Sequence, residues 1–461
     1  MTLHILKNKL IIMKKSIVIV ACVCVSLIGV WGCSVDEDNL EEGFLNFEKT
    51  ASQNIPIPDI IRNQVVVRFR DTTLSDIEKR NKRITIEGLY NFNILKKETC
   101  DCDKNGPELW TIDTTHNNFM GVEHLVENLV TNQSSSNGDE NVEGDEHAVY
   151  DYQFYITIAN NTLSGNYTTS INNRIIASNN PDYVNIAILD TGVDYDFFPD
   201  PFLYNTKNIR NGTFGISGWD YINHDNDSRD DNGHGSKITK IITTELNTSN
   251  IPHQILPIKA FDQDGSGSYF DIVCGMNYIS KLHNIHAVNM SFGWYGLRNQ
   301  SILKAIMEEI TDDTLFITSA GNYGINIDEE TPHFPSGYDI DNLLGVGGYE
   351  LSLEEELELP DLLEFITLER SNYGSLNIDL AAPIDNYTLV MQSNPNLTVH
   401  PVGTSFSAAY ITSIAGKLYD KENSTLQLYT DIMDTCHKVP RLQRKIEEGN
   451  IMLRLNNRQS F

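Results

Sequence analysis

The sequence predicts an α/β fold in which a doubly wound, mostly parallel sheet is flanked by helices and preceded by a small α+β unit. Short apolar runs recur from residue 183 onward, and helical spacing separates several of them. This pattern is typical of buried parallel strands joined by crossover helices. The chain has 461 residues, of which 40% are hydrophobic. It is therefore long enough for more than one domain and apolar enough to form a core.

The charge balance bears on the partners of the protein. The formal net charge is -29, from 63 acidic and 34 basic residues. This acidity argues against nucleic acid as a partner, because phosphate binding requires a basic face. The acidity is typical of a solvated, exported protein or of one that acts on basic substrates.

The N-terminal segment, residues 1–33, predicts export. Lysines precede an apolar run from Ser16 to Trp31, which is too short for a comfortable membrane span and fits the core of a signal peptide. Translation starts at Met1 or Met13. The end of this region, Gly29 to Cys33, resembles a bacterial lipobox, although a small residue is usual at position 31, where this chain has Trp. We expect lipidation at Cys33 and a bacterial membrane-anchored lipoprotein, and the acidic residues after Cys33 resemble a surface-export tag. Secretion with an unmodified Cys33 is the alternative.

The next segments predict a tether, a folded unit and a linker. Residues 34–63 are acidic and Pro-punctuated, as a tether would be. Residues 64–158 form the α+β unit, with expected strands at 64–70, 109–112 and 150–158 and expected helices at 75–83 and 121–130. Residues 159–182 are rich in Asn, Ser and Thr and have few apolar side chains. We expect them to be an exposed linker that is easily cleaved.

The α/β domain is expected to span residues 183–455. Its expected strands and helices are strands 184–190, 255–260, 287–291, 314–319 and 343–347 and helices 269–281 and 301–309. Active groups of such sheets gather at the C-terminal ends of the strands. Residues 350–369 form an acidic, Leu-rich insertion, for which we expect a solvated surface helix.

The seven cysteines do not suggest a disulfide framework. Cys100 and Cys102 are too close in sequence for a routine bridge, and Cys274 lies in an apolar helical pattern that favours a buried thiol.

A short stretch near the C-terminus, PVGTSFSAA at residues 401–409, suggests chemistry. Gly403 permits a sharp turn, and Ser405 then starts a helix that runs to Leu418. Unpaired N–H groups at a helix start favour developing negative charge, so a hydroxyl nucleophile fits there if a base lies near it. The alternative for Ser405 alone is a cap of an ordinary helix.

Two other glycine-bearing motifs could supply the base and its orienting acid. Asp190 ends a strand just before Gly192, and His234 lies between two glycines ahead of a helix. The order Asp, His, Ser along the chain is the order of the subtilisin triad.

Residues 183–417 resemble the subtilisin-like serine peptidases, or subtilases. The blocks that carry the resemblance are IAILDTGVD, DDNGHGS, DGSGSY, NMSFG, TSAGNYG, SNYG with LAAP, and GTSFSAA, in the family's order. The resemblance implies that Ser405 is the nucleophile, that His234 is the general acid and base, and that Asp190 orients His234. It also implies an oxyanion hole made by the Asn322 side chain and the backbone N–H of Ser405.

The same resemblance implies where a substrate binds. Two glycine-containing edges would pair with an extended polypeptide, largely independently of its sequence. These edges are Gly265, Ser266 and Gly267 on one side and Ser291, Phe292 and Gly293 on the other. Tyr269 and Phe292 would shape an outer apolar pocket. Ser319, Ala320 and Gly321 would line the pocket for the residue before the scissile bond.

No cofactor is certain from the motifs. The family's usual calcium loop is shortened here between residues 246 and 253, so no metal ligand follows from the resemblance. An acidic cluster remains a candidate for structural calcium, and a solvated acidic loop is the favoured alternative. Its members are Asp225, Asp227, Asp230 and Asp231. Other departures from the family are Lys237 and Lys240 after the histidine, and Ala409 in place of a proline.

The sequence as a whole predicts an exported, lipid-anchored serine endopeptidase that acts through an acyl-enzyme. Its expected partners are a polypeptide substrate, the membrane through the anchor, and its own propeptide. The unit at 64–158 is the candidate propeptide, because it weakly resembles the inhibitory propeptide of the family. One alternative is a processing peptidase of narrow specificity that removes leaders. The other is a catalytically silent, peptide-binding lipoprotein.

Overall fold

The computed structural model describes residues 55–116, 118–130, 147–158, 182–198, 202–206, 217–297, 300–329, 331–351, 363–390 and 398–454. The chain divides into two units, Met1–Gln53 and Asn54–Phe461, and the described residues all belong to the second. The expected signal peptide, Cys33 and most of the tether and linker lie outside them. None of the helices described is long and apolar enough to cross a membrane.

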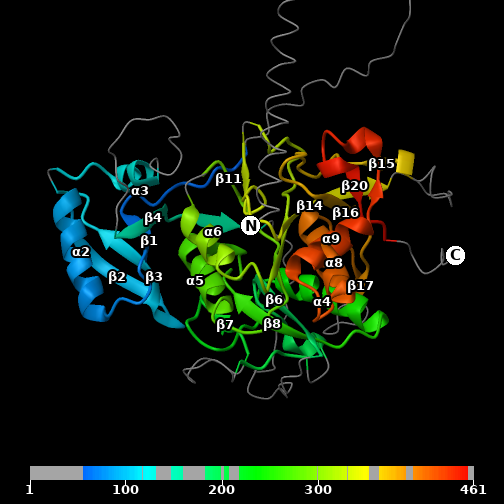
Figure 1. Cartoon of the computed structure of the whole chain (residues 1–461), viewed down its shortest axis with the longest axis horizontal. Coiled ribbons are helices and arrows are strands. Elements are labelled where there is room, and N and C mark those ends of the chain that lie inside the picture. The colour runs from blue at the N-terminus through cyan, green and yellow to red at the C-terminus, as the bar shows by residue number, and fades with distance from the viewer. Residues whose placement is uncertain are drawn as a thin grey trace, which may run out of the picture. The chain divides into compact units, whose positions relative to one another are not determined.

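The second unit is built on a sheet of ten strands (Figure 1), and this sheet is mostly parallel, as the sequence predicts. The strands run in the order β19-β20-β16-β14-β12-β10-β6-β8-β7, with β15 pairing to β14, and every pair from β7 to β20 along that path is parallel. Its strands are β6 (Val184–Asp190), β7 (Trp219–Asp220), β8 (His253–Lys259), β10 (Ala287–Met290), β12 (Leu315–Ser319), β14 (Leu343–Leu351), β15 (Ile366–Thr367), β16 (Leu380–Pro383), β19 (His437–Lys438) and β20 (Asn450–Ile451). The five strands expected from apolar runs are confirmed.

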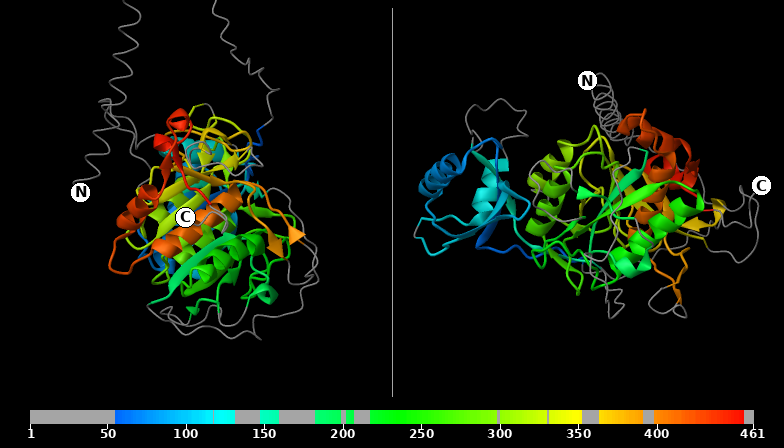
Figure 2. Two further views of the ribbon diagram at one scale, coloured as in Figure 1. Left: turned by 90° about the vertical axis from the view of Figure 1, so that its right-hand side faces the viewer. Right: turned by 90° about the horizontal axis from the view of Figure 1, so that it is seen from below.

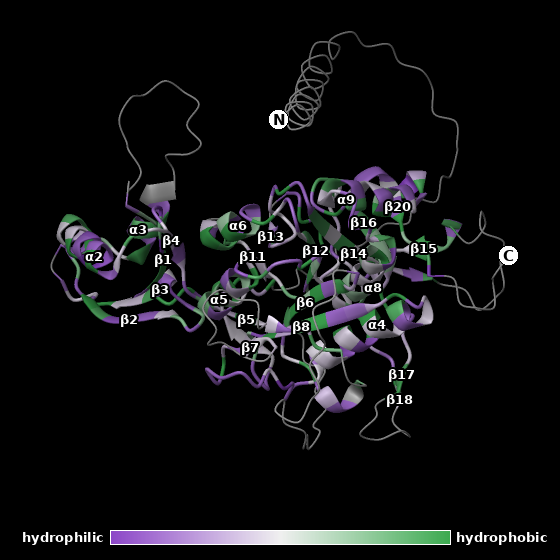
Figure 3. Ribbon diagram, turned by 60° about the horizontal axis from the view of Figure 1, so that its bottom comes forward, coloured by the Kyte–Doolittle hydropathy of each residue, from purple (hydrophilic) through white to green (hydrophobic). Residues whose placement is uncertain are grey.

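Helices cover both faces of this sheet (Figures 1 and 2). One face packs against α4 (His234–Thr248), α8 (Thr404–Leu418) and α9 (Thr425–Asp434), and the other against α5 (Tyr269–Ile279) and α6 (Ser301–Glu308). The expected helices at 269–281 and 301–309 are confirmed. Hydrophobic residues run along the central strands β6 and β12 (Figure 3), because both faces of those strands are buried.

The smaller sheet, here called the front sheet, has the order β2-β3-β1-β4 and is antiparallel throughout. Its elements are β1 (Gln64–Phe69), α2 (Asp76–Tyr90), β2 (Ile94–Cys100), β3 (Asp103–Ile112), α3 (Val122–Val130) and β4 (Ala148–Tyr152). We call residues 55–158 the front unit. Ser75 caps α2 through a capping box with Glu78. The helix is longer than expected, and β2 was missed because its polar Lys-Lys-Glu-Thr stretch carries little apolar alternation.

The strand expected at 150–158 is instead two strands in different sheets. β4 completes the front sheet, whereas β5 (Tyr155–Thr157) pairs antiparallel with β9 (Ser266–Ser268) of the α/β domain. At the last residue of β4, Tyr152, the backbone exchanges two hydrogen bonds with the Gln300 side chain, at 3.0 and 2.9 Å. A long-range partner therefore decides where the strand breaks, which alternation in sequence does not reveal.

Two further expectations need correction. Cys100 and Cys274 form a disulfide across 174 residues of sequence, so Cys274 is not a buried thiol and the cysteines do include a structural bridge. The acidic insertion, expected to be a surface helix, begins and ends in a strand pairing of Glu350 with Thr367. The correction applies to the two ends only: residues 352–362 lie outside the described part of the chain, and the helix expected there stays a prediction.

Candidate active site

The predicted acid and base meet at the C-terminal edge of the sheet. Asp190 is the last residue of β6, and His234 is the first residue of α4. The Nδ1 atom of His234 lies 2.8 Å from Oδ1 and 3.0 Å from Oδ2 of Asp190. Both side chains are buried, with 2% and 0% exposure. The pair can therefore hold an imidazole in a fixed tautomer and orientation.

A glycine lets the two motifs approach so closely. A Cβ atom on Gly235 would lie only 2.2 Å from the carbonyl oxygen of Gly192 and 3.2 Å from Oδ1 of Asp190. Any side chain at position 235 would therefore push α4 away from the loop that follows β6. This explains the glycine that follows His234 in the sequence.

Asp230, which the sequence suggested only as a calcium candidate, fixes the start of α4. Its carboxylate accepts hydrogen bonds from the N–H groups of Asn232, Gly233 and Ser236 and from the Ser236 hydroxyl, at 2.6 to 2.9 Å. It also accepts one from the hydroxyl of Thr191, which follows Asp190. A carboxylate at a helix N-terminus is favoured electrostatically. Asp230 thus joins the loop of the acid to the helix of the base.

A buried lysine, which sequence reasoning missed, supports the same loop. Lys259 ends β8 and is fully buried, and its Nζ donates to the carbonyl oxygens of Thr191 (2.9 Å) and Phe261 (3.0 Å). Its charge is paired with Asp231 at 2.5 Å. The sequence signal was weak, since a lysine at a strand end is usually solvated.

Ser405 lies in the first turn of α8, next to the base. Gly403 precedes the helix at φ 142°, a conformation that favours glycine. The ring of Phe406 lies 5.6 Å from that of His234, centroid to centroid. The Ser405 hydroxyl donates to the carbonyl of Ser291 at 3.1 Å, and no hydrogen bond joins it to His234 within the described part of the chain. The serine is therefore beside the base but turned toward the substrate edge.

Asn322 is oriented toward the same place. Its Oδ1 accepts a hydrogen bond from the backbone N–H of Thr404 at 2.8 Å. This leaves Nδ2 as the donor on the side of the cleft that Asn322 lines. The Ser405 N–H belongs to the first turn of α8, where backbone donors have no partner within the helix. Two donors are thus available near the Ser405 hydroxyl.

A cleft of about 690 Å³ contains most of these residues. Of the expected site residues, those that line it are His234, Ser291, Phe292, Gly293, Ser319, Gly321, Asn322 and Ser405. Asp190 and Ala320 are buried behind its wall. The edge formed by Gly265, Ser266 and Gly267 is already paired: β5 occupies it, and the N–H of Ile158 donates to the carbonyl of Gly265 at 2.8 Å.

Tyr269 does not lie where the resemblance implied. It is fully buried and is not among the cleft-lining residues. Its ring stacks on Phe154 of the front unit at 5.2 Å, and its hydroxyl donates to Asp151 at 2.6 Å. It belongs to the contact with the front unit because α5, which it starts, faces that unit.

The acidic cluster near residue 230 is dispersed among protein partners. Asp230 caps α4, Asp231 pairs with Lys259, and Asp227 pairs with Arg229 at 2.7 Å. Within the described ranges, no group of three or more His, Cys, Asp or Glu side chains could hold a metal ion.

A parallel sheet that brings an acid–imidazole pair and a helix-start serine to one cleft has the architecture of a serine hydrolase. Within that class, the chain belongs to the subtilase family of serine-type endopeptidases, whose profile matches residues 182–439.

The curated relatives agree with this assignment. A thermophilic serine proteinase of Bacillus sp. (strain AK1) is 26% identical over 260 residues, which is 55% of this chain and 56% of that protein. Thermitase of Thermoactinomyces vulgaris is 24% identical, over 55% of this chain and 81% of the relative. Among solved structures, a cold-adapted subtilisin-like serine proteinase is 20% identical with a TM-score of 0.42, covering 66% of this chain and 97% of the other.

Proposed function

We propose that this protein is an exported serine endopeptidase that hydrolyses peptide bonds through an acyl-enzyme on Ser405. The observation that carries the proposal is the hydrogen bond between Asp190, behind the wall of the cleft, and His234, which lines the cleft together with Ser405. A hydroxyl is a poor nucleophile at neutral pH, so it needs such a base.

In the proposed reaction, the Ser405 hydroxyl turns from the Ser291 carbonyl to the Nε2 atom of His234 and gives up its proton as its oxygen attacks the substrate carbonyl. Asp190 holds the imidazolium through Nδ1. The oxyanion of the tetrahedral intermediate accepts hydrogen bonds from Asn322 Nδ2 and the Ser405 N–H. His234 then gives its proton to the leaving amine, and water, activated by the same imidazole, releases the acyl group.

The front unit acts in this proposal as an inhibitory propeptide. Its strand β5 already forms the antiparallel pairing with Ser266–Ser268 that a substrate would form. Cleavage in the linker at 159–182 would be the first step of activation. Until the strand leaves, the edge is closed to other polypeptides.

Export and lipidation at Cys33 remain parts of the proposal. The disulfide supports export, because such bridges persist mainly in oxidising compartments. The apolar run before Cys33 supports a cleaved leader.

A fluorophosphonate probe, which modifies activated serines, tests the proposal. After removal of the front unit, we expect labelling of the wild type and none of Ser405→Ala. Absence of labelling in both would favour the silent peptide-binding lipoprotein. A peptide library distinguishes broad degradation from the narrow processing alternative, since a processing peptidase would cleave few of its members.

A further inference from the structure

The floor of one substrate pocket is filled by a histidine that sequence reasoning did not single out. His333 starts β13 (His333–Phe334), is buried, and lines the cleft. A Cβ atom on Gly293 would lie 2.2 Å from its Nε2, and one on Gly321 would lie 3.2 Å from the same atom. The imidazole therefore occupies the space between the two segments that are expected to flank the residue before the scissile bond.

Neighbouring polar groups narrow the same space and hold the ring in place. The Tyr295 hydroxyl would lie 2.4 Å from a Cβ on Gly321, and Asn372 fixes that hydroxyl by donating to it at 2.7 Å. The His333 ring shares a hydrogen bond of 2.8 Å between Nδ1 and the Ser336 hydroxyl. Burial lowers the pKa of His333 to about 3, so the ring is neutral at physiological pH. The pocket floor is thus polar, uncharged and rigid.

We propose that His333 determines specificity by restricting the residue before the scissile bond to Gly, Ala or Ser. The inference rests on the proposed function and narrows its substrate class. A long side chain would have to displace a hydrogen-bonded ring. A cationic one would find no carboxylate among the described residues of the α/β domain that line the cleft.

Peptides that differ only at the residue before the scissile bond test this inference. In the active wild type, kcat/KM should be about 100-fold higher for Ala than for Phe or Leu. In His333→Ala, cleavage after Phe or Leu should rise, and the ratio should fall at least about tenfold. His437→Ala, a histidine far from the cleft on β19, is the matched control and should keep the ratio.

The ratio separates a specificity role from a structural one, because general damage lowers cleavage of all peptides alike. Efficient wild-type cleavage after Phe or Leu would overturn the inference, whether or not His333→Ala folds. An unchanged ratio in an active His333→Ala would also overturn it. If no peptide is cleaved and fluorophosphonate does not label Ser405, the proposed function itself has failed.

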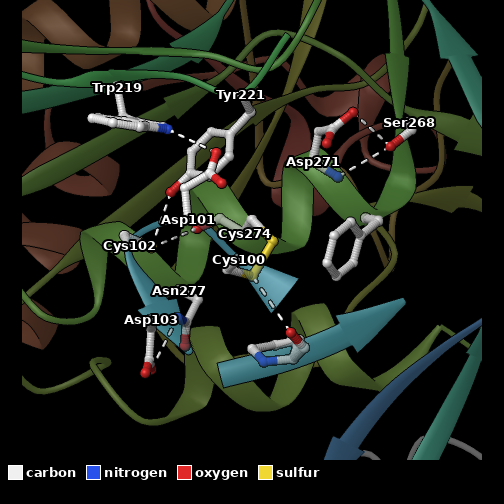
Figure 4. Close-up of a disulfide and its surroundings, with 12 residues drawn as sticks. Cys100, Asp101, Cys102, Asp103, Trp219, Tyr221, Ser268, Asp271, Cys274 and Asn277 are labelled. Atoms are coloured by element: carbon white, nitrogen blue, oxygen red, sulfur yellow. Dashed lines mark hydrogen bonds between the residues drawn. A yellow bond between two sulfur atoms is a disulfide. The ribbon is translucent and has the colours of Figure 1, made fainter. Parts of the chain in front are cut away.

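A second observation, the disulfide, concerns activation and stands independently. Cys100 ends β2 of the front sheet and Cys274 lies in α5 of the α/β domain, so the bridge joins the two sides of the expected cleavage linker (Figure 4). A cut anywhere in residues 159–182 would leave the front unit covalently attached. The only other cysteine thiols in the described part of the chain, Cys102 and Cys436, are unbridged.

The bridge lies in a well-packed contact. The turn after Cys100 lies against α5 and β7, where Trp219 donates to Asp101 at 3.2 Å and Tyr221 donates to the Cys102 sulfur at 3.1 Å (Figure 4). Both bridged cysteines are only 1% exposed. Burial also raises the pKa of Cys102 to about 12, which makes it a poor internal nucleophile for exchange. Reduction therefore requires an external thiol and a transient opening of this contact.

We propose that the Cys100–Cys274 disulfide keeps the cut front unit on the enzyme, and that a small dithiol reductant releases it. A tether of this kind gives an effective concentration of about 1 mM, so an inhibitor with a Kd of about 1 µM would stay bound in roughly 99.9% of molecules. In the release step the S–S bond breaks, each cysteine gains a hydrogen, and the dithiol is oxidised to its disulfide, with two electrons and two protons transferred.

The full-length wild-type protein, purified without reductant after linker cleavage, tests the second proposal. On a denaturing gel, the front fragment and the α/β domain should migrate together without reductant and separately with dithiothreitol. Peptide hydrolysis should rise at least about tenfold on adding dithiothreitol. The Cys100→Ser/Cys274→Ser variant should be active without it, and Cys436→Ser should behave like the wild type.

Separation of the fragments on a gel without reductant would overturn the proposal, as would hydrolysis that does not respond to complete reduction. Both measurements use the wild type, so they hold even if the double variant does not fold. The gel result does not depend on catalysis by Ser405, because an added protease can cut the linker.

Discussion

The Ser405 hydroxyl donates a hydrogen bond to the Ser291 carbonyl, so within the proposed triad it is not bonded to His234. The acid and the base are joined, and the serine is adjacent but turned away. Ser291 belongs to the expected substrate edge, and an occupying peptide would compete for its carbonyl. We infer that binding of substrate helps to direct the hydroxyl toward His234.

Asn322 provides a sharp test of the oxyanion hole. Asn322→Ala should lower kcat by about 100- to 1,000-fold and leave KM nearly unchanged, because the amide would bind charge that develops only in the transition state. Steady-state kinetics on a single peptide measure this, with Asn386→Ala in an exposed loop as the control. A rise in KM of the same size with an unchanged kcat would instead assign Asn322 to ground-state binding.

His286 should make the fold sensitive to acid. Burial lowers its pKa to about 4, and its Nδ1 accepts the backbone N–H of Asn185 at 3.1 Å. Above pH 6.5 the histidine is neutral whether the chain is folded or unfolded. Between pH 6.5 and 4 only the unfolded chain gains the proton, so the free energy of unfolding falls, by up to about 3 kcal/mol.

The matched comparison is Ser405→Ala with and without His286→Gln. The Ser405→Ala background prevents self-digestion during the measurement. Urea unfolding at pH 7 and pH 4.5 should show that the parent loses about 2–3 kcal/mol more than the glutamine variant. Parallel losses in the two proteins would show that His286 does not titrate in this way.

At the scale of elements, Asp151 at the end of the front sheet caps α6 of the α/β domain. Its carboxylate accepts hydrogen bonds from the N–H groups of Ser301 (2.8 Å) and Ile302 (2.7 Å), from the Ser301 hydroxyl and from Tyr269. The residue is fully buried. The front unit thus supplies acceptors for N–H groups at the start of α6, which have no partner within that helix.

Asp151→Ala should weaken the hold of the front unit by about 3 kcal/mol, roughly 100-fold, because several buried donors lose their acceptor at once. After linker cleavage and reduction, peptide hydrolysis should appear faster than in the parent. Asp113→Ala, on an exposed turn of the same unit, should change nothing. Equal rates in the parent and Asp151→Ala would show that α6 is not the anchor.

The elements also show which features the sequence could predict. Strands β6, β8, β10, β12 and β14 and the motifs around Asp190, His234 and Ser405 follow from local patterns, since apolar runs and glycine turns are read within ten residues. The pairing of β5 with β9, the hydrogen bond that joins Asp230 to Thr191 and the position of His333 depend on partners far along the chain. Local patterns do not contain that information, and the Cys100–Cys274 bridge was missed for the same reason.

For the whole molecule, the order of segments means that the disulfide would decide where the cut enzyme is found: at the membrane or in solution. The expected lipid site, Cys33, precedes the front unit, and the proposed catalytic residues all follow the linker. Once the linker is cut, the Cys100–Cys274 bridge is the covalent connection between the anchor and the catalytic domain within the described structure. In the proposed lipid-anchored form, reduction would both open the cleft and free the α/β domain from the membrane.

Membrane fractionation of cells that express the full chain tests this linkage. After linker cleavage and a high-salt wash, the α/β domain should sediment with membranes and move to the supernatant when dithiothreitol is added. Cys33→Ser should be in the supernatant throughout, and Cys100→Ser/Cys274→Ser should be there without reductant. An α/β domain that stays in the membrane fraction after full reduction must have a second attachment, and the bridge would then control inhibition but not location.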